Sequence, residues 1–94
     1  MKQVNAHRKK VVIDDIKRIP LESGVYFLFQ KGLLVYIGKA LNLQKRIKDH
    51  VVGKVFDEIE YELAHWSRSR ELEEELLKGY HNQHGQYPYY NHQG

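Results

Sequence analysis

The chain has 94 residues, which fits one compact domain and leaves little room for a second. It contains no cysteine, which excludes disulfides, thiolate zinc sites and a cysteine nucleophile. No apolar run resembles a leader peptide or approaches the roughly 18 residues of a membrane span, so we expect an intracellular, cytoplasmic protein.

The net charge of +3 is unevenly distributed along the chain. Residues 1–18 carry six basic and two acidic side chains, and residues 31–54 carry six basic and one acidic. Residues 55–94 carry three basic and eight acidic side chains. Concentrated basic charge in the first half favours a polyanionic partner such as nucleic acid, although ordinary surface charge is the alternative.

The N-terminal twenty residues are predicted to form a basic arm and a short helix. Residues 1–10 lack an apolar pattern, residues 12–18 suit a short helix, and Pro20 ends it. We therefore divide the chain into an N-terminal region, residues 1–20, and a domain over residues 21–94.

Two strands joined by a tight turn are predicted to follow. Residues 24–30 and 33–39 are rich in β-branched and aromatic side chains. A three-residue loop over 30–32 would place Tyr26 directly opposite Tyr36, whereas a two-residue loop would place them on opposite faces. The sequence leaves both registers open.

A helix is predicted over residues 40–52, and Gly53 ends it. Leu43, Ile47 and Val51 recur every four residues and form its apolar stripe. Asn42, Arg46 and His50 share the same spacing on a neighbouring face.

A strand and a long helix complete the domain. Residues 58–65 alternate apolar side chains with glutamates, which predicts a strand with one wet face. Residues 67–82 suit a helix, with Ser67 or Ser69 as the N-cap. The order β, β, α, β, α predicts an α+β domain, a small antiparallel sheet packed by helices.

Glu73 is the carboxylate of the last helix with the strongest functional signal. It falls within the apolar arc of that helix, which consists of Leu72, Leu76, Leu77 and Tyr80. A carboxylate among apolar neighbours requires a cation or a proton. Arg46 or Arg70 could supply the cation, the side chain could extend to solvent, or Glu73 could bind a hard divalent ion.

Several other side chains suit phosphate chemistry. The guanidinium of Arg46 can hold a phosphate, and His50, one turn later, can accept or relay a proton. Tyr26 and Tyr36 could be core residues or could offer phenols to water or phosphate, and Gly38 could allow backbone to approach a phosphate. His81 and His84 lack a third ligand for zinc, so we do not expect a zinc site there.

Taken together, these segments resemble the GIY-YIG nuclease family, in the variant typical of the excision-repair nuclease subunit. Residues 24–26 (GVY) and 36–38 (YIG) match the two triplets, and Lys39-Ala40, Asn42-Leu43 and Arg46 follow as in the family's helix. Residues 72–77 (LEEELL) match the acidic helix motif, and residues 88–91 (PYYN) match the closing segment. The resemblance extends over residues 23–91.

The resemblance implies a three-stranded antiparallel sheet flanked by helices and a metal-dependent DNA endonuclease. Tyr26 would assist the attacking water, Tyr36 would support it, Arg46 would bind the scissile phosphate, and His50 would help with proton transfer. Glu73 would hold a single Mg²⁺ or Mn²⁺ ion, although the longer spacing to Asn91 leaves Glu74 or Glu75 possible by alignment. Further substrate contacts are expected from Gly38, Lys39, Lys45 and Asn91.

Two other functions remain open at this stage. The chain could be a non-catalytic DNA-binding module of the same fold, or it could dock on a larger nuclease. A homodimer and RNA as substrate are also compatible with the sequence. No membrane association is expected.

Overall fold

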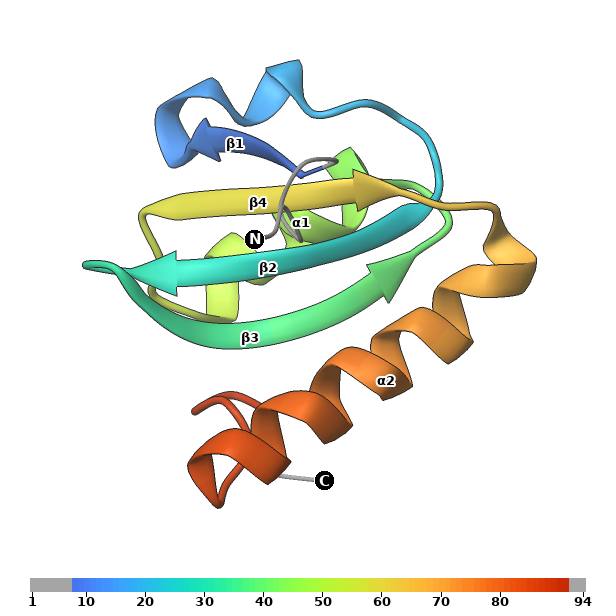
Figure 1. Cartoon of the computed structure of the whole chain (residues 1–94). Coiled ribbons are helices and arrows are strands. Elements are labelled where there is room, and N and C mark those ends of the chain that lie inside the picture. The colour runs from blue at the N-terminus through green and yellow to red at the C-terminus, as the bar shows by residue number, and fades with distance from the viewer. Residues whose placement is uncertain (1–7, 92–94) are drawn as a thin grey trace.

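The structure is a computed structural model and describes residues 8–91. In chain order its elements are β1 (Lys9–Val12), the 3-10 helix η1 (Ile13–Arg18), β2 (Gly24–Gln30), β3 (Leu33–Ala40), α1 (Leu43–Gly53), β4 (Glu58–Leu63) and α2 (Trp66–His84). The strands form one antiparallel sheet in the order β1-β4-β2-β3 (Figure 1). The predicted α+β class with a small antiparallel sheet is confirmed.

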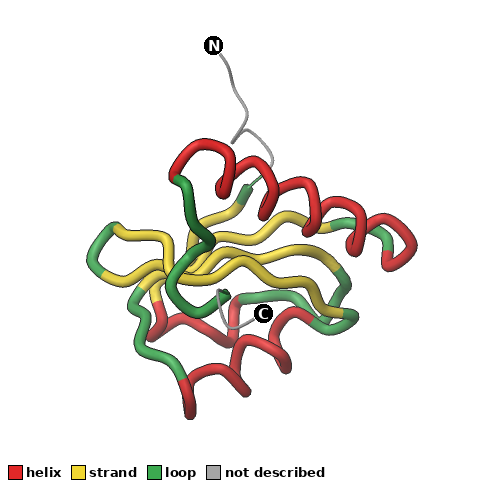
Figure 2. The backbone as a smooth tube through the Cα atoms, turned by 90° about the horizontal axis from the view of Figure 1, so that it is seen from below, coloured by secondary structure: helices red, strands yellow, loops and turns green. Residues whose placement is uncertain are grey.

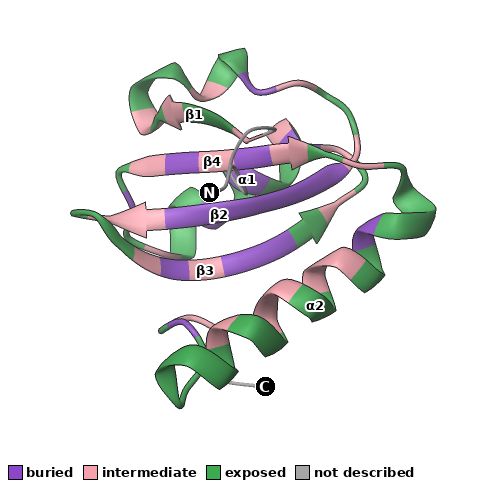
Figure 3. Ribbon diagram, in the orientation of Figure 1, coloured by how far each residue is buried: buried purple, intermediate pink, exposed green. Residues whose placement is uncertain are grey.

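The sheet is the middle one of three layers. α1 and η1 lie on one face and α2 lies on the other (Figure 2). Side chains alternate along β2, so that Tyr26 and Leu28 face α1 while Val25 and Phe27 face α2. Because helices cover both faces of the sheet, β2 is buried along most of its length (Figure 3). This central strand carries Tyr26 into the core.

The layer formed by α1 differs in detail from its prediction. β3 continues to Ala40, and the helix begins at Leu43 because the Asn42 side chain caps it by accepting a hydrogen bond from Lys45 N at 3.0 Å. Leu43 and Ile47 are buried as predicted, but Val51 is 46% exposed. His50 is buried instead, so the helix presents an imidazole to the sheet.

The opposite layer is formed by α2, which is longer than predicted. Its N-cap is His65, whose side chain accepts a hydrogen bond from Ser67 N, so the expectation of Ser67 or Ser69 as the cap is wrong. The helix ends where Gly85 adopts a positive φ of 78°. Its apolar residues pack on Val25, Phe27 and Ile37, as the helical spacing predicted; they are Leu72, Leu76, Leu77 and Tyr80.

The β2–β3 hairpin has the two-residue loop of the second alternative, but the tyrosines do not lie on opposite faces as that alternative predicted. Its loop is Lys31-Gly32, and both residues have positive φ, as in a type I′ turn. A bulge at Val35 then shifts the pairing, so that Leu28 lies opposite Tyr36 and Tyr26 lies opposite Gly38. The extra residue returns the two tyrosines to one face, as diagonal neighbours rather than a directly opposed pair.

The sheet has a fourth strand that the sequence analysis missed. Residues 9–12, assigned above to the arm and the start of a helix, form β1 and pair with β4, with Val11 opposite Ile59. β4 ends at Leu63 rather than at residue 65. Its glutamate face is only half-exposed, and Glu60 there forms an ion pair with Arg8 at 3.1 Å. The rest of the predicted arm, residues 1–7, lies outside the described residues.

None of the helices in the described part of the chain is long and apolar enough to cross a membrane.

Candidate active site

A buried tyrosine–histidine pair lies between the sheet and α1. Tyr26 Oη and His50 Nε2 are 2.6 Å apart, and Tyr26 is completely buried. Burial, with Lys54 and Arg46 close by, lowers the pKa of His50 to about 4. Burial and the neighbouring Tyr36 raise the pKa of the Tyr26 phenol well above its ordinary value. At neutral pH the imidazole is therefore neutral, and in the tautomer with its proton on Nδ1 the Tyr26 hydroxyl donates the hydrogen bond to Nε2.

The lowered pKa of His50 predicts that the fold loses stability in mild acid. In the unfolded chain His50 binds a proton with the ordinary pKa of 6.5, whereas in the folded chain it does so only near pH 4. The free energy of unfolding is therefore unaffected by protonation of His50 above pH 6.5 and decreases as the pH falls from 6.5 toward 4. Between pH 7.5 and pH 5 we expect a loss of about 2 kcal/mol in the free energy of unfolding, measured by urea denaturation. His50→Gln, which cannot titrate, should remove this component, and parallel pH profiles of the two proteins would contradict the assignment.

Tyr36 and Gly38 complete the surroundings of the Tyr26 hydroxyl. The Tyr36 ring lies 5.9 Å from the Tyr26 ring and 4.9 Å from the His50 ring, between centroids. A β-carbon on Gly38 would lie 2.6 Å from Tyr26 Oη and 2.7 Å from the Tyr36 ring. Position 38 therefore requires glycine, because the Tyr26 phenol occupies the space that a β-carbon would need.

Gly38→Ala should consequently displace the Tyr26 ring and destabilise the fold by about 1–3 kcal/mol, the usual range for overpacking a core. The free energy of unfolding from urea titration tests this expectation. Gly79→Ala is the matched control, because a β-carbon there meets no atom within 4 Å and the position is helical. The control should be as stable as the natural chain or gain up to about 1 kcal/mol. Equal stability of both variants would contradict the close packing at Gly38.

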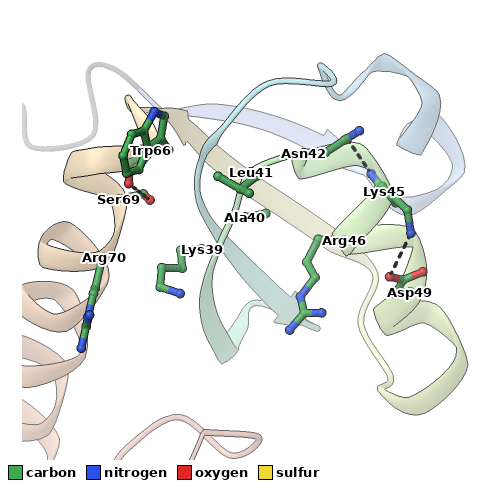
Figure 4. Close-up of a pocket in the computed structure, with 10 residues that line it drawn as sticks. All are labelled: Lys39, Ala40, Leu41, Asn42, Lys45, Arg46, Asp49, Trp66, Ser69 and Arg70. Atoms are coloured by element: carbon green, nitrogen blue, oxygen red, sulfur yellow. Dashed lines mark hydrogen bonds and ion pairs between the residues drawn. The ribbon is translucent and has the colours of Figure 1, made fainter.

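Arg46 connects the buried pair to an open cleft. Its guanidinium lowers the pKa of Tyr26 both by its charge and by a side-chain hydrogen bond, although burial outweighs this effect. The cleft has a volume of about 580 Å³ (Figure 4). It is lined by Lys39, Ala40, Leu41, Asn42, Lys45, Arg46, Asp49, Trp66, Ser69 and Arg70. Four of these residues are cationic and one is acidic, so the cleft has the charge expected of an anion site.

Glu73 lies beside this cleft on α2. It is half-buried, whereas Glu74 and Glu75 are exposed. Burial raises the pKa of Glu73, and the cleft residue Lys39 opposes this shift. The predicted arginine partners are not used, because Arg70 pairs with Glu74 at 3.5 Å. The described residues contain no cluster of three or more histidine or acidic side chains that could hold a metal alone.

Asn91 lies on the backbone of β3. Its Oδ1 accepts a hydrogen bond from Ile37 N at 2.8 Å, and its Nδ2 donates to Ile37 O at 2.9 Å. Tyr90 N also donates to Val35 O at 2.8 Å. The C-terminal segment therefore holds the β3 backbone on both sides of Tyr36, and Asn91 does not line the cleft.

The structure brings together the predicted residues Tyr26, Tyr36, Gly38, Arg46 and His50 in one cluster. Lys39 and Lys45 line the adjacent cleft and Glu73 lies at its side.

Sequence reasoning missed Lys54, whose Nζ lies 4.9 Å from the Tyr36 ring centroid. It continues the four-residue spacing of Arg46 and His50, which was the available signal. It also missed Trp66, which belongs to no recognised motif and lines the cleft only in the folded chain.

The chain is similar to the UvrABC system protein C and to solved structures of a UvrC endonuclease domain. No protein-family model matches the chain. The UvrABC system protein C of Rhizobium johnstonii is 44% identical over 41 residues, which is 43% of this chain and 6% of that protein. The same protein of Helicobacter pylori is 50% identical over 40 residues, or 42% and 7%. The matched segments thus span only a small part of these longer relatives.

Solved structures extend the match over most of the chain. The GIY-YIG N-terminal endonuclease domain of UvrC from Thermotoga maritima, as a point mutant bound to its catalytic divalent cation, is 30% identical. The match covers 83% of this chain and 91% of that domain, with a TM-score of 0.66. The magnesium-bound form of the domain is 28% identical and gives a TM-score of 0.64 over 83% and 97% of the two chains. Given this identity and coverage, the chain belongs to the GIY-YIG nuclease family.

Proposed function

We propose that this chain is a divalent-metal-dependent endonuclease that hydrolyses phosphodiester bonds in DNA. The observation that carries the proposal is the Tyr26–His50 pair, with Arg46 joining it to a cationic cleft. A proton acceptor and a phosphate-binding cation are thus adjacent, which is what water attack on a phosphodiester requires.

The proton path follows from the protonation states. A tyrosine whose pKa is raised is a poor base by itself, because it holds its own proton at neutral pH. Neutral His50 can take that proton while the Tyr26 oxygen receives one from the attacking water. In this scheme His50 is the final acceptor, Tyr26 is the relay, and Tyr36 packs beside both rings.

Arg46 and Lys39 would bind the scissile phosphate in the cleft. A guanidinium can contact two phosphate oxygens and stabilise the charge that gathers on them during attack. Lys45 and Arg70 extend the cationic surface, although the former pairs with Asp49 at 4.0 Å and the latter with Glu74. Asn91 would act by positioning β3, since both its amide atoms bond to Ile37.

The residues present fit a single Mg²⁺ or Mn²⁺ ion at Glu73. Magnesium is often bound by one or two carboxylates, with water and substrate phosphate as the other ligands. Glu73 is half-buried, and its proton affinity is raised by burial, so a dication would relieve an unfavourable carboxylate. When bound, such an ion stabilises negative charge on the phosphate and the leaving oxygen.

The proposal extends to the substrate, the cellular compartment and the partners of the chain. The similar proteins are an endonuclease domain and a component of the UvrABC system, so DNA is the proposed substrate and the cytoplasm the proposed compartment. One site cuts one strand, so a homodimer or a larger nuclease partner would be needed to cut both. A non-catalytic module that only binds DNA is the alternative.

Arg46→Ala tests the proposal on supercoiled plasmid with magnesium. We expect single-turnover nicking to fall about 10²–10³-fold, the usual effect of removing one group that stabilises transition-state charge. Lys48→Ala is the control, because Lys48 is an exposed cation of the same helix that does not line the cleft. Equal nicking by both variants would contradict the proposed phosphate site.

A further inference from the structure

One end of the cleft is apolar and aromatic rather than cationic. Trp66, the first residue of α2, is 62% exposed, and Leu41 beside it in the cleft is 74% exposed. Figure 4 shows both side chains at one end, with Lys39 and Arg46 further along the same cleft. Single exposed apolar residues are common on protein surfaces, but Trp66 lies in the same cleft as the cations Lys39 and Arg46.

Adjacent aromatic and cationic surfaces suit unpaired nucleotides. Cations follow the sugar–phosphate backbone while bases stack on aromatic rings, which is the usual way in which single-stranded DNA is bound. Bases in a duplex are stacked on each other and expose only their edges, so they offer no face to an indole. A phosphate held by Arg46 and Lys39 would leave a flanking base free to reach Trp66 only where that base is unpaired.

We propose that Trp66 stacks on an unpaired base next to the cleaved phosphodiester, so that the chain prefers DNA with a single-stranded segment or a junction beside the cut. This inference rests on the proposed function for the position of the phosphate. The stacking itself can be measured without cleavage.

The protein carries its own reporter, because Trp66 is its only tryptophan. In EDTA, which prevents metal-dependent cutting, titration with a single-stranded oligonucleotide should quench most of the Trp66 fluorescence. The same sequence as a blunt duplex, and an abasic oligonucleotide of equal length, should bind through phosphates with little quenching. Quenching that is equal for the oligonucleotide with bases and the abasic one would overturn the proposal.

Variants provide the second arm of the experiment. Trp66→Ala should weaken binding of the single strand about 5- to 150-fold, the range measured for loss of one stacked base, and should leave duplex binding within about twofold. Trp66→Phe should retain most of the affinity. Tyr87→Ala is the matched control, since Tyr87 is an exposed aromatic residue outside the cleft. Equal single-strand affinity of Trp66→Ala and the natural chain would overturn the proposal.

The two proposals fail in distinguishable ways. Magnesium-dependent nicking without selective quenching by single strands would leave the nuclease in place and overturn the stacking of Trp66. Selective quenching in a protein that cuts no DNA would support the stacking and contradict the nuclease.

Discussion

Glu73→Gln is expected to abolish DNA nicking, with a loss of about 10³-fold or more in the single-turnover rate. The substitution keeps the size and polarity of the side chain but removes the negative charge that would hold a divalent ion. Because Glu73 is only half-buried and has no ion pair in the described part of the chain, the fold should survive the change. Retained stability separates a loss of metal binding from a loss of structure.

Glu74→Gln is the matched control for this substitution. Glu74 is the next carboxylate on α2, but it is exposed and pairs with Arg70 on the surface. Its loss should change nicking less than about fivefold, since the Glu74 side chain is exposed and its surface ion pair contributes about 1 kcal/mol or less to stability. Loss of activity in Glu74→Gln alone would keep the nuclease and refute the assignment of Glu73. Because burial raises the pKa of Glu73, magnesium affinity should fall with acidification at a higher pH than for an ordinary glutamate ligand.

Tyr26→Phe should lower the nicking rate about 10²–10⁴-fold, the usual contribution of a general acid–base group. Phenylalanine retains the ring that packs in the core, so the main change is the loss of the hydroxyl between water and His50. The free energy of unfolding should fall by about 1–3 kcal/mol, because the hydrogen bonds of the hydroxyl to His50 and Arg46 are lost. Single-turnover nicking and urea denaturation measure the two effects separately.

Tyr61→Phe is the control for the tyrosine, because Tyr61 belongs to the same core cluster but lines a different part of the surface. Its nicking rate should stay within about threefold of the natural chain. A relay through His50 further predicts that His50→Gln impairs nicking at every pH from 5 to 9. Full activity in Tyr26→Phe would contradict the proton path through Tyr26 and His50.

The sequence predicted the elements of this fold better than their pairing. The strands β2 and β3 were found from their β-branched and aromatic composition, and the apolar arc of α2 from its helical spacing. The bulge at Val35 was not predictable, since a bulge inserts one residue without a local signal. It decides which face Tyr36 occupies, so the contact between the two tyrosines required the structure.

β1 was missed for a different reason. Only four residues long and beginning with two lysines, it lacks the alternation that identifies a half-buried strand. Its pairing with β4 depends on a contact between segments about fifty residues apart. Local propensity cannot report such a contact, whereas the resemblance to known nucleases predicted only three strands.

The candidate site was predictable in its composition but not in its electrostatics. The motifs identified Tyr26, Arg46 and Glu73, and helical spacing added His50. The pKa of His50 is lowered mainly because the imidazole is buried. It is buried against Tyr26, whose phenol in turn packs over Gly38. The cleft that joins Arg46 to Trp66 exists only after α2 packs beside β3.

Magnesium-dependent nicking of supercoiled plasmid by the purified chain tests the central claim most directly. The Glu73→Gln protein, purified in the same way, provides the blank for any contaminating nuclease. We predict open circles with the natural chain in magnesium, none in EDTA, and none above background with Glu73→Gln. DNA binding without cleavage in magnesium or manganese, or equal nicking by both proteins, would contradict the claim that this site cuts DNA.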